Sequence, residues 1–198
     1  MQIEMRKRIA NLTSNILNPF LVSLIIILLL AFESASSTLD AVKWSLILIA
    51  VSILPVFSVV IYLVRAGRLD GIFTSARRRR TKLYCLAGAC ASVGCIILVC
   101  CGAPLILIAT FVAGLSAVVI FMGINLWWKI SLHTAFITAL VTVLVILYGW
   151  IAAATIGLIF LMSWARLELK HHSLAQAATG ALLAALIVVV VFYLFDLV

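Results

Sequence analysis

Long apolar runs are the feature of this sequence that most restricts how the chain can fold. Runs of about 18 or more such residues can cross the hydrocarbon core of a bilayer as a helix. Of the 198 residues, 67% are hydrophobic and only 10% are charged, whereas soluble domains are roughly 45–50% apolar and about 25% charged. We therefore predict an all-α integral membrane protein, a bundle of about seven (six to seven) transmembrane helices. Too few polar residues remain for a second, soluble domain, so residues 1–198 should form a single membrane domain.

The apolar runs also place the expected spans along the chain. These cover approximately Asn18–Phe32, Lys43–Val64, Leu83–Cys101, Ala103–Met122, Ser131–Gly149, Trp150–Ala165 and Leu174–Leu197. Pro55 falls near the middle of the second span and is expected to kink it. The third and fourth spans are joined so tightly, through Gly102 and Pro104, that they should form an antiparallel hairpin. The first run follows three basic residues, as in a signal peptide, but we interpret it as a retained span.

Positive charge is distributed very unevenly between the two ends of these spans. Alternating the spans puts the N-terminus and three polar links, 65–82, 123–130 and 166–173, on one face, where thirteen of the fourteen Lys and Arg residues lie; only Lys43 lies opposite. Such asymmetry in short loops predicts that this face is cytoplasmic. The net charge of +8 therefore indicates contact with lipid head groups, and no nucleic-acid partner is expected.

The three polar links can converge on one site because two-span hairpins separate them. Their chemistry is that of a pocket for an anion with several oxygens: Arg offers a planar fork for phosphate, Lys a point charge, and histidine a nucleophile or a proton donor. The residues concerned are Arg77–Arg80, Lys129, Ser131, His133, Arg166 and His172. Since no carboxylate cluster could hold Mg²⁺, we expect neither a metal nor another cofactor.

Two of these links resemble motifs of a known family. "KISLHT" at Lys129–Thr134 and "ARLELKHHSLAQ" at Ala165–Gln176 resemble the second and third motifs of the type 2 phosphatidic acid phosphatase superfamily, Pro-Ser-Gly-His and Ser-Arg-x5-His-x3-Asp. The matching residues are Ser131, His133, Arg166 and His172. The first motif is weaker. The chain is more similar to a divergent prokaryotic branch, in which an Asp precedes an Arg-x-x-Arg element and Trp-Lys-Ile-Ser-x-His replaces the usual second motif. Asp70, Arg77 and Arg80 match the first of these elements, and Trp128 and Lys129 match the second. The resemblance covers residues 68–184, which would form a phosphatase-like core.

The resemblance implies roles for these residues. His172 would attack phosphorus and His133 would protonate the leaving group, while Arg80, Lys129, Ser131 and Arg166 would bind phosphate. Arg77, Asp70 and Gln176 are further candidates. The implied function is that of a metal-independent membrane phosphatase, which hydrolyses a lipid phosphate or polyprenyl (di)phosphate monoester through a phosphohistidine. The protein would be a multi-pass protein of a prokaryotic plasma membrane, with the N-terminus and the active site at the cytoplasmic face.

Several departures from the motifs keep an alternative open. Ile130 and Leu132 replace the proline and glycine of the second motif, and Ala165 replaces the serine of the third. Gln176 stands where the family has the acid that orients the nucleophile, and an amide supplies no charge to stabilise an imidazolium. The alternative is therefore a catalytically impaired phosphatase-like protein that binds anionic lipid. The sequence selects neither the lipid nor the oligomeric state.

Overall fold

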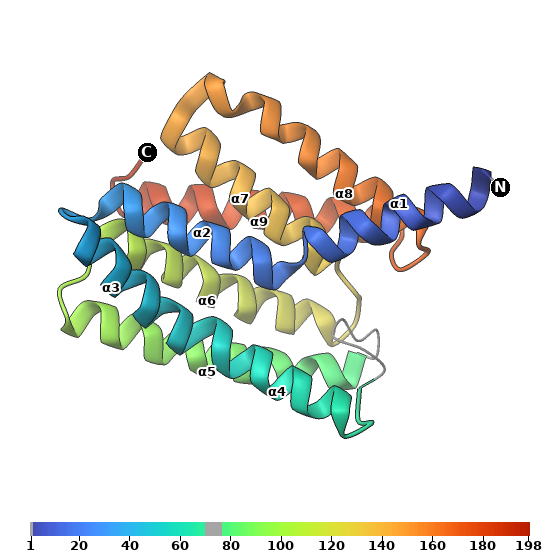
Figure 1. Ribbon diagram of the computed structural model, residues 1–198, viewed down its shortest axis with the longest axis horizontal. Coiled ribbons are helices and arrows are strands. Elements are labelled where there is room, and N and C mark those ends of the chain that lie inside the picture. Colours follow the sequence, from blue (N-terminus) through green and yellow to red (C-terminus); the bar gives the residue numbers. More distant parts are fainter. Residues whose placement is uncertain (1, 70–76) are drawn as a thin grey trace. The chain divides into compact units, whose positions relative to one another are not determined.

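The computed structural model describes residues 2–69 and 77–198, all of whose regular elements are helical. The α-helices are α1 (Gln2–Ile16), α2 (Pro19–Ser34), α3 (Thr38–Leu48), α4 (Leu54–Arg65), α5 (Arg77–Cys100), α6 (Leu105–Asn125), α7 (Leu132–Tyr148), α8 (Gly157–Glu168) and α9 (Leu174–Leu194) (Figure 1). Five helical segments of this part of the chain are long and apolar enough to cross a membrane, or six if the bent pair α1–α2 is one span. The protein is thus an all-α integral membrane bundle, as the sequence predicts.

The chain forms two compact units, neither of which is one continuous stretch. The first unit contains Met1–Ser23, Lys129–Val190 and Val198; the second contains Leu24–Trp128 and Val191–Leu197. Each unit is described by itself below.

In the second unit, the expected kink at Pro55 takes the form of a change in helix type. Helices α3 and α4 are joined by a π-helix, η1 (Ile49–Ile53), and Pro55 lies in the first turn of α4. Proline has no N–H to donate, and its ring collides with the carbonyl four residues earlier in an α-helix. A π-turn directly before the proline is one of the usual responses to this conflict, and the 28 residues from Thr38 to Arg65 still form one span.

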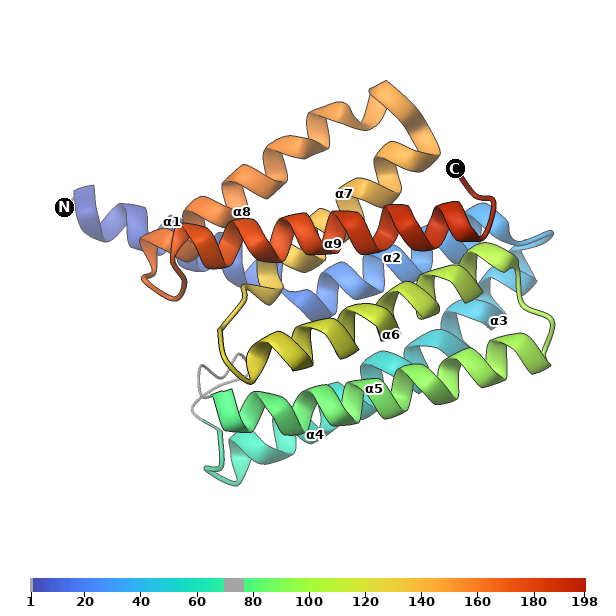
Figure 2. The ribbon, with the colours of Figure 1, turned by 180° about the vertical axis from the view of Figure 1, so that it is seen from behind.

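The hairpin expected around Gly102 is confirmed. Helix α5 ends with Gly102 in the left-handed region, at φ 64°. The Gly102 N–H donates to the Val99 carbonyl, and the Ala103 N–H to the Leu98 carbonyl, which is the hydrogen-bond pattern of a Schellman turn. Pro104 then caps α6, which returns alongside α5 (Figure 2).

One boundary in this unit was predicted wrongly. The basic run 77–82 was expected in the loop of residues 65–82, but α5 already begins at Arg77. Arginine and lysine are among the better helix formers, so the helix extends beyond the apolar run that marks the span.

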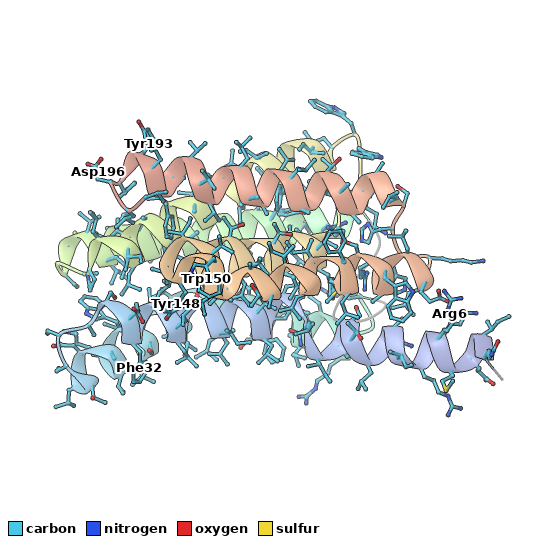
Figure 3. The ribbon with its side chains drawn as sticks, turned by 90° about the horizontal axis from the view of Figure 1, so that it is seen from above. Arg6, Phe32, Tyr148, Trp150, Tyr193 and Asp196 are labelled. Atoms are coloured by element: carbon cyan, nitrogen blue, oxygen red, sulfur yellow. The ribbon has the colours of Figure 1, made fainter. Side chains whose placement is uncertain are left out.

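In the first unit, α7 and α8 form the expected antiparallel hairpin. A 3₁₀ segment, η2 (Gly149–Ile156), turns the chain between them (Figures 1 and 2). Tyr148 and Trp150 lie at this turn, at the end of α8 remote from Arg6 (Figure 3), as is common for aromatic residues near a membrane surface.

Helix α1 was not predicted, because residues 2–16 are too polar to be recognised as part of a membrane span. It packs against α8 and bends by 43° relative to α2. Asn18 forms the joint: its side-chain oxygen accepts from the Phe20 and Leu21 N–H groups at 3.0 Å, and so caps α2.

Candidate functional site

The polar segment before α7 is held by the helix that it starts. Ser131 is the N-cap of α7, and its hydroxyl accepts from the Thr134 N–H at 3.4 Å. Ser131 is fully buried, and His133, in the first turn of the helix, is only 3% exposed. Two of the predicted site residues are therefore fixed by the backbone geometry of one helix start, where the helix dipole is positive.

The segment before α9 is held by a reciprocal cap. The Ser173 hydroxyl accepts from the Gln176 N–H at 3.3 Å, and the Gln176 side-chain oxygen accepts from the Ser173 N–H at 3.2 Å. This is a capping box, Ser-x-x-Gln. Gln176, at the position where the resemblance predicts an acid, thus has a structural role at the start of α9.

The same Gln176 oxygen also orients His172. His172 Nδ1 lies 3.2 Å from Gln176 Oε1. A backbone N–H can only donate, so the atom that faces the Ser173 N–H must be the amide oxygen and not the amide nitrogen. That oxygen can only accept, and Nδ1 must therefore carry a hydrogen. In the neutral ring this leaves the lone pair on Nε2, which is the tautomer that a nucleophilic histidine requires.

The starts of α7 and α9 lie against each other. The Ser131 N–H donates to the Gln176 carbonyl at 3.1 Å, and the Thr134 hydroxyl lies 3.2 Å from the Ala177 carbonyl oxygen. Gly180 makes this approach feasible, because a Cβ at that position would lie 2.7 Å from the Ser131 carbonyl oxygen. Two helix N-termini, both favourable to anions, therefore meet in the first unit.

The link between α8 and α9 brings cations to this place. Lys170 adopts the left-handed region, at φ 55°, and the His171 N–H donates back to the Arg166 carbonyl. The Lys129 ammonium donates to the His171 carbonyl at 3.3 Å. The pKa of His171 is lowered, first by partial burial and then by the positive charges of Arg166 and Lys129. Two positive charges therefore lie near His171, an arrangement that favours anion binding.

Arg166 is fixed by a residue that the sequence analysis missed. Its guanidinium donates to the Ser14 hydroxyl of α1 at 2.7 Å, and both residues are buried, at 6% and 3% exposure. Eight residues before Ser14 on α1 and two residues after Arg166 on α8, Arg6 and Glu168 form an ion pair of 2.9 Å. The amphipathic spacing of residues 2–16 could have revealed the helix, but no local signal pairs Ser14 with Arg166.

The remaining predicted residues belong to the second unit or fall outside the described structure. Arg80 is 6% exposed and contacts Tyr84, with its guanidinium 3.3 Å from the phenol oxygen. The neighbouring Thr81 hydroxyl accepts from the Asn125 amide at 3.2 Å. Asp70 lies outside the described residues, and only the backbone of Arg77 is described. That Arg80 joins the cluster of the first unit stays a prediction.

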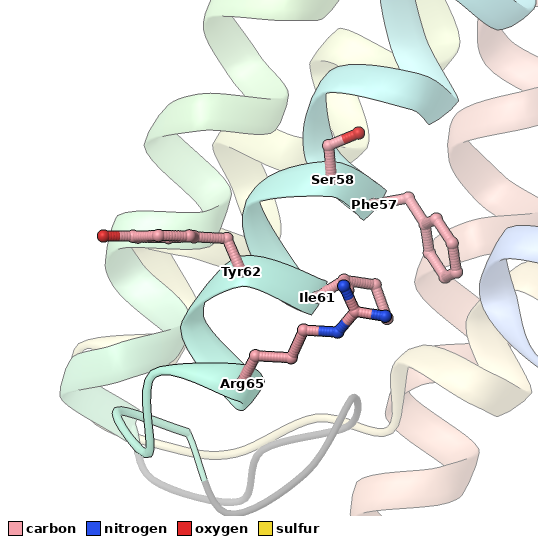
Figure 4. A pocket seen from close by; sticks show the side chains of 5 residues that line it. All are labelled: Phe57, Ser58, Ile61, Tyr62 and Arg65. Atoms are coloured by element: carbon pink, nitrogen blue, oxygen red, sulfur yellow. The ribbon is translucent and has the colours of Figure 1, made fainter.

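A cavity of the second unit contains none of the predicted site residues. It has a volume of about 340 Å³ and lies along α4. Its lining consists of Phe57, Ser58, Ile61, Tyr62 and Arg65 (Figure 4). The wall is mostly apolar with one cation at its end, which differs from the polar cluster around His172.

Comparison with known proteins identifies no relative: no family model, curated protein or solved structure matches this chain.

Proposed function

We propose that the protein is a membrane phosphatase that hydrolyses a lipid phosphate or polyprenyl (di)phosphate through a phosphohistidine at His172. The observation that carries this proposal is the hydrogen bond from His172 Nδ1 to Gln176 Oε1, since it directs the Nε2 lone pair for attack. The cations Lys129 and Arg166 beside the same link support it, because clustered cations stabilise the charge of a transferring phosphoryl group.

The proposed reaction has two balanced steps. His172 Nε2 attacks phosphorus and forms a P–N bond, while the P–O bond to the lipid breaks and the leaving oxygen takes a proton from His133. Water then attacks phosphorus and gives its proton to His133, and the P–N bond breaks with its electron pair returning to Nε2. Inorganic phosphate and the dephosphorylated lipid leave, and both histidines regain their starting states.

The membrane setting supports a lipid as substrate. The cluster lies at the ends of apolar helices that are long enough to cross a bilayer, so a head group could reach it while the lipid tail stays in the hydrocarbon. The asymmetry of Lys and Arg residues supports a cytoplasmic position for these links in a prokaryotic plasma membrane.

Phosphate release from purified protein tests the proposal. A panel of phosphatidic acid, phosphatidylglycerol phosphate and polyprenyl (di)phosphates is offered in the presence of EDTA. His172→Ala should lower the release by a factor on the order of a thousand or more. His171→Ala is the matched control, because it removes the adjacent imidazole and should retain most of the activity. Release that is absent for every substrate, or unchanged in His172→Ala, contradicts the mechanism.

One observation favours a second function, that of a lipid-binding protein without turnover. The Gln176 oxygen is shared between His172 and the Ser173 N–H, and an amide lends no negative charge to an imidazolium. The same pocket would then hold a lipid phosphate without cleaving it. Saturable binding of phosphatidic acid by a protein that releases no phosphate, with binding weakened by Lys129→Gln, would establish this function.

A further inference from the structure

Helix α1 exposes a row of large apolar side chains, here called the α1 apolar stripe. It consists of Met5, Ile9, Leu12 and Ile16, whose exposed fractions are 57%, 49%, 60% and 51%. Successive residues of an α-helix are rotated by about 100°, so the spacing of four, three and four residues keeps the stripe within about 60° of the helix circumference. The stripe is thus one continuous apolar side.

A second side of α1 is fixed against α8. Ala10 and Ser14 are buried there, and Ser14 accepts the hydrogen bond from Arg166. The ion pair between Arg6 and Glu168 holds the preceding turn. These contacts determine the rotation of α1 about its axis, and the stripe therefore cannot turn inward to be buried on α8.

A third side of α1 is polar. Glu4, Asn11 and Asn15 are exposed, and the helical rotation places them roughly 100° from the stripe. In hydrocarbon these groups would lose their water without compensation, whereas in water the stripe would be left uncovered. Both sides are satisfied only at a boundary between an apolar and an aqueous phase.

The chain itself shows which boundary this is. Only Leu17 and Asn18 separate α1 from α2, a helix composed almost entirely of apolar residues. With so short a joint, the C-terminal end of α1 directly adjoins this apolar helix, from which α1 is bent by 43°. Arg8 falls between the stripe and the polar side, where a long side chain reaches the level of the lipid phosphates.

We propose that α1 lies in the head-group layer as an anionic-lipid anchor, with the α1 apolar stripe among the acyl chains and Arg8 on lipid phosphate. Three sides of one helix meet protein, lipid and water, which is the pattern of an interfacial amphipathic helix. The proposal does not depend on the phosphatase activity.

Photo-crosslinking of the full chain identifies what covers the stripe. Benzoylphenylalanine replaces Leu12 on the stripe or, as a matched control, Asn11 on the polar side. Each protein is reconstituted in vesicles of equimolar phosphatidylcholine and phosphatidylglycerol and irradiated, and its intact mass is measured. The Leu12 variant should gain the mass of one lipid and the Asn11 variant should not. Replacement of Ile16 repeats the test one turn away, in case the Leu12 variant does not fold.

A pair of charge variants then tests the role of Arg8. Arg8→Gln and Lys7→Gln remove the same charge, but Lys7 lies on the side of the helix away from the stripe. Arg8→Gln should lower the ratio of phosphatidylglycerol to phosphatidylcholine adducts at position 12 by roughly fivefold, and Lys7→Gln should change it much less. A covalent dimer in place of a lipid adduct, equal adducts at positions 11 and 12, or equal effects of the two charge variants would overturn the proposal.

Discussion

Gln176 is the residue on which the proposed chemistry of this protein depends most directly. Its side-chain oxygen caps α9 through Ser173 and holds Nδ1 of His172. It therefore fixes the ring orientation of the histidine, but it adds no negative charge when the ring becomes positive. Orientation and charge stabilisation, which one carboxylate would supply together, are separated in this site.

Gln176→Glu should therefore raise activity. Glutamate also serves as the fourth residue of a capping box, so the cap should persist while the hydrogen bond to His172 becomes charge-assisted. Charge-assisted bonds are about twice as strong as neutral ones, which corresponds to a rate of phosphate release about five- to tenfold higher. The comparison variant Gln176→Ala, which loses both the cap and the hydrogen bond, should release phosphate more slowly than the parent. A slower Gln176→Glu enzyme would contradict the proposed role of His172.

His171 should report the positive charge of the cluster around His172. Its pKa lies below the ordinary 6.5 because of partial burial and the positive charges of Arg166 and Lys129. Removing one of these charges in Lys129→Gln should move the pKa of His171 upward, and so should inorganic phosphate bound beside them. The shift is measured by NMR titration of labelled histidine, with Lys43→Gln as the control for an equal loss of charge elsewhere. An unmoved pKa would mean that Lys129 does not act on His171.

The same lowered pKa fixes the sign of the pH dependence of stability. Below pH 6.5 the unfolded chain binds a proton on this histidine before the folded protein does, so acidification favours unfolding. The thermal midpoint should therefore fall as the pH decreases through the window between 6.5 and the lowered pKa. His171→Gln should remove that part of the dependence.

At the scale of elements, the site depends on how closely α9 approaches the start of α7. A Cβ on Gly180 would lie 2.7 Å from a backbone oxygen, that of Ser131, which cannot rotate away. A Cβ added to Gly114 on α6, by contrast, would meet no atom within 4 Å. Both glycines lie within α-helices, but Gly180 is buried and Gly114 is exposed, so they differ in what a methyl group would meet.

Gly180→Ala should therefore destabilise the protein by about 1–3 kcal/mol, because the overpacked helices must separate. Gly114→Ala, by contrast, should be neutral or stabilising by up to about 1 kcal/mol, owing to the better helix propensity of alanine. Unfolding in detergent measures both, and phosphate release should fall in the first variant only. Equal effects of the two substitutions would show that α7 and α9 are not in close contact.

At the scale of the whole molecule, the asymmetry of basic residues defines the expected orientation. The turn after α5 contains an exposed native cysteine, Cys101, at the opposite end of that helix from the basic run. A membrane-impermeant thiol reagent should label this end of α5 in intact cells, and a chain with both Cys100→Ser and Cys101→Ser should lose that label, because Cys100 is exposed as well. A cysteine introduced by Ala66→Cys into this double variant should react only after lysis. Labelling of position 66 in intact cells would reverse the orientation.

The spans could be predicted from the sequence because a bilayer imposes a local requirement. Each helix must satisfy its own backbone hydrogen bonds and bury about 20 apolar residues in lipid, so hydropathy alone locates α6, α7, α9 and the end of α5 to within a few residues. The caps are local as well: Ser173 and Gln176 form a recognisable capping box, and Gly102 with Pro104 marks a turn. Helix α1 was not predicted because its residues contain no long apolar run.

The apolar runs that most restrict the fold thus determined, by themselves, a helical membrane bundle, and the order of the spans predicts that its basic residues gather at one end of them. Only the tertiary structure decided which side chains meet there. Ser14 contacts Arg166, Lys129 contacts the backbone of His171, and Gly180 admits the start of α7. These contacts join segments that are far apart in the sequence, and they depend on the packing of whole helices, which no pattern within one helix specifies.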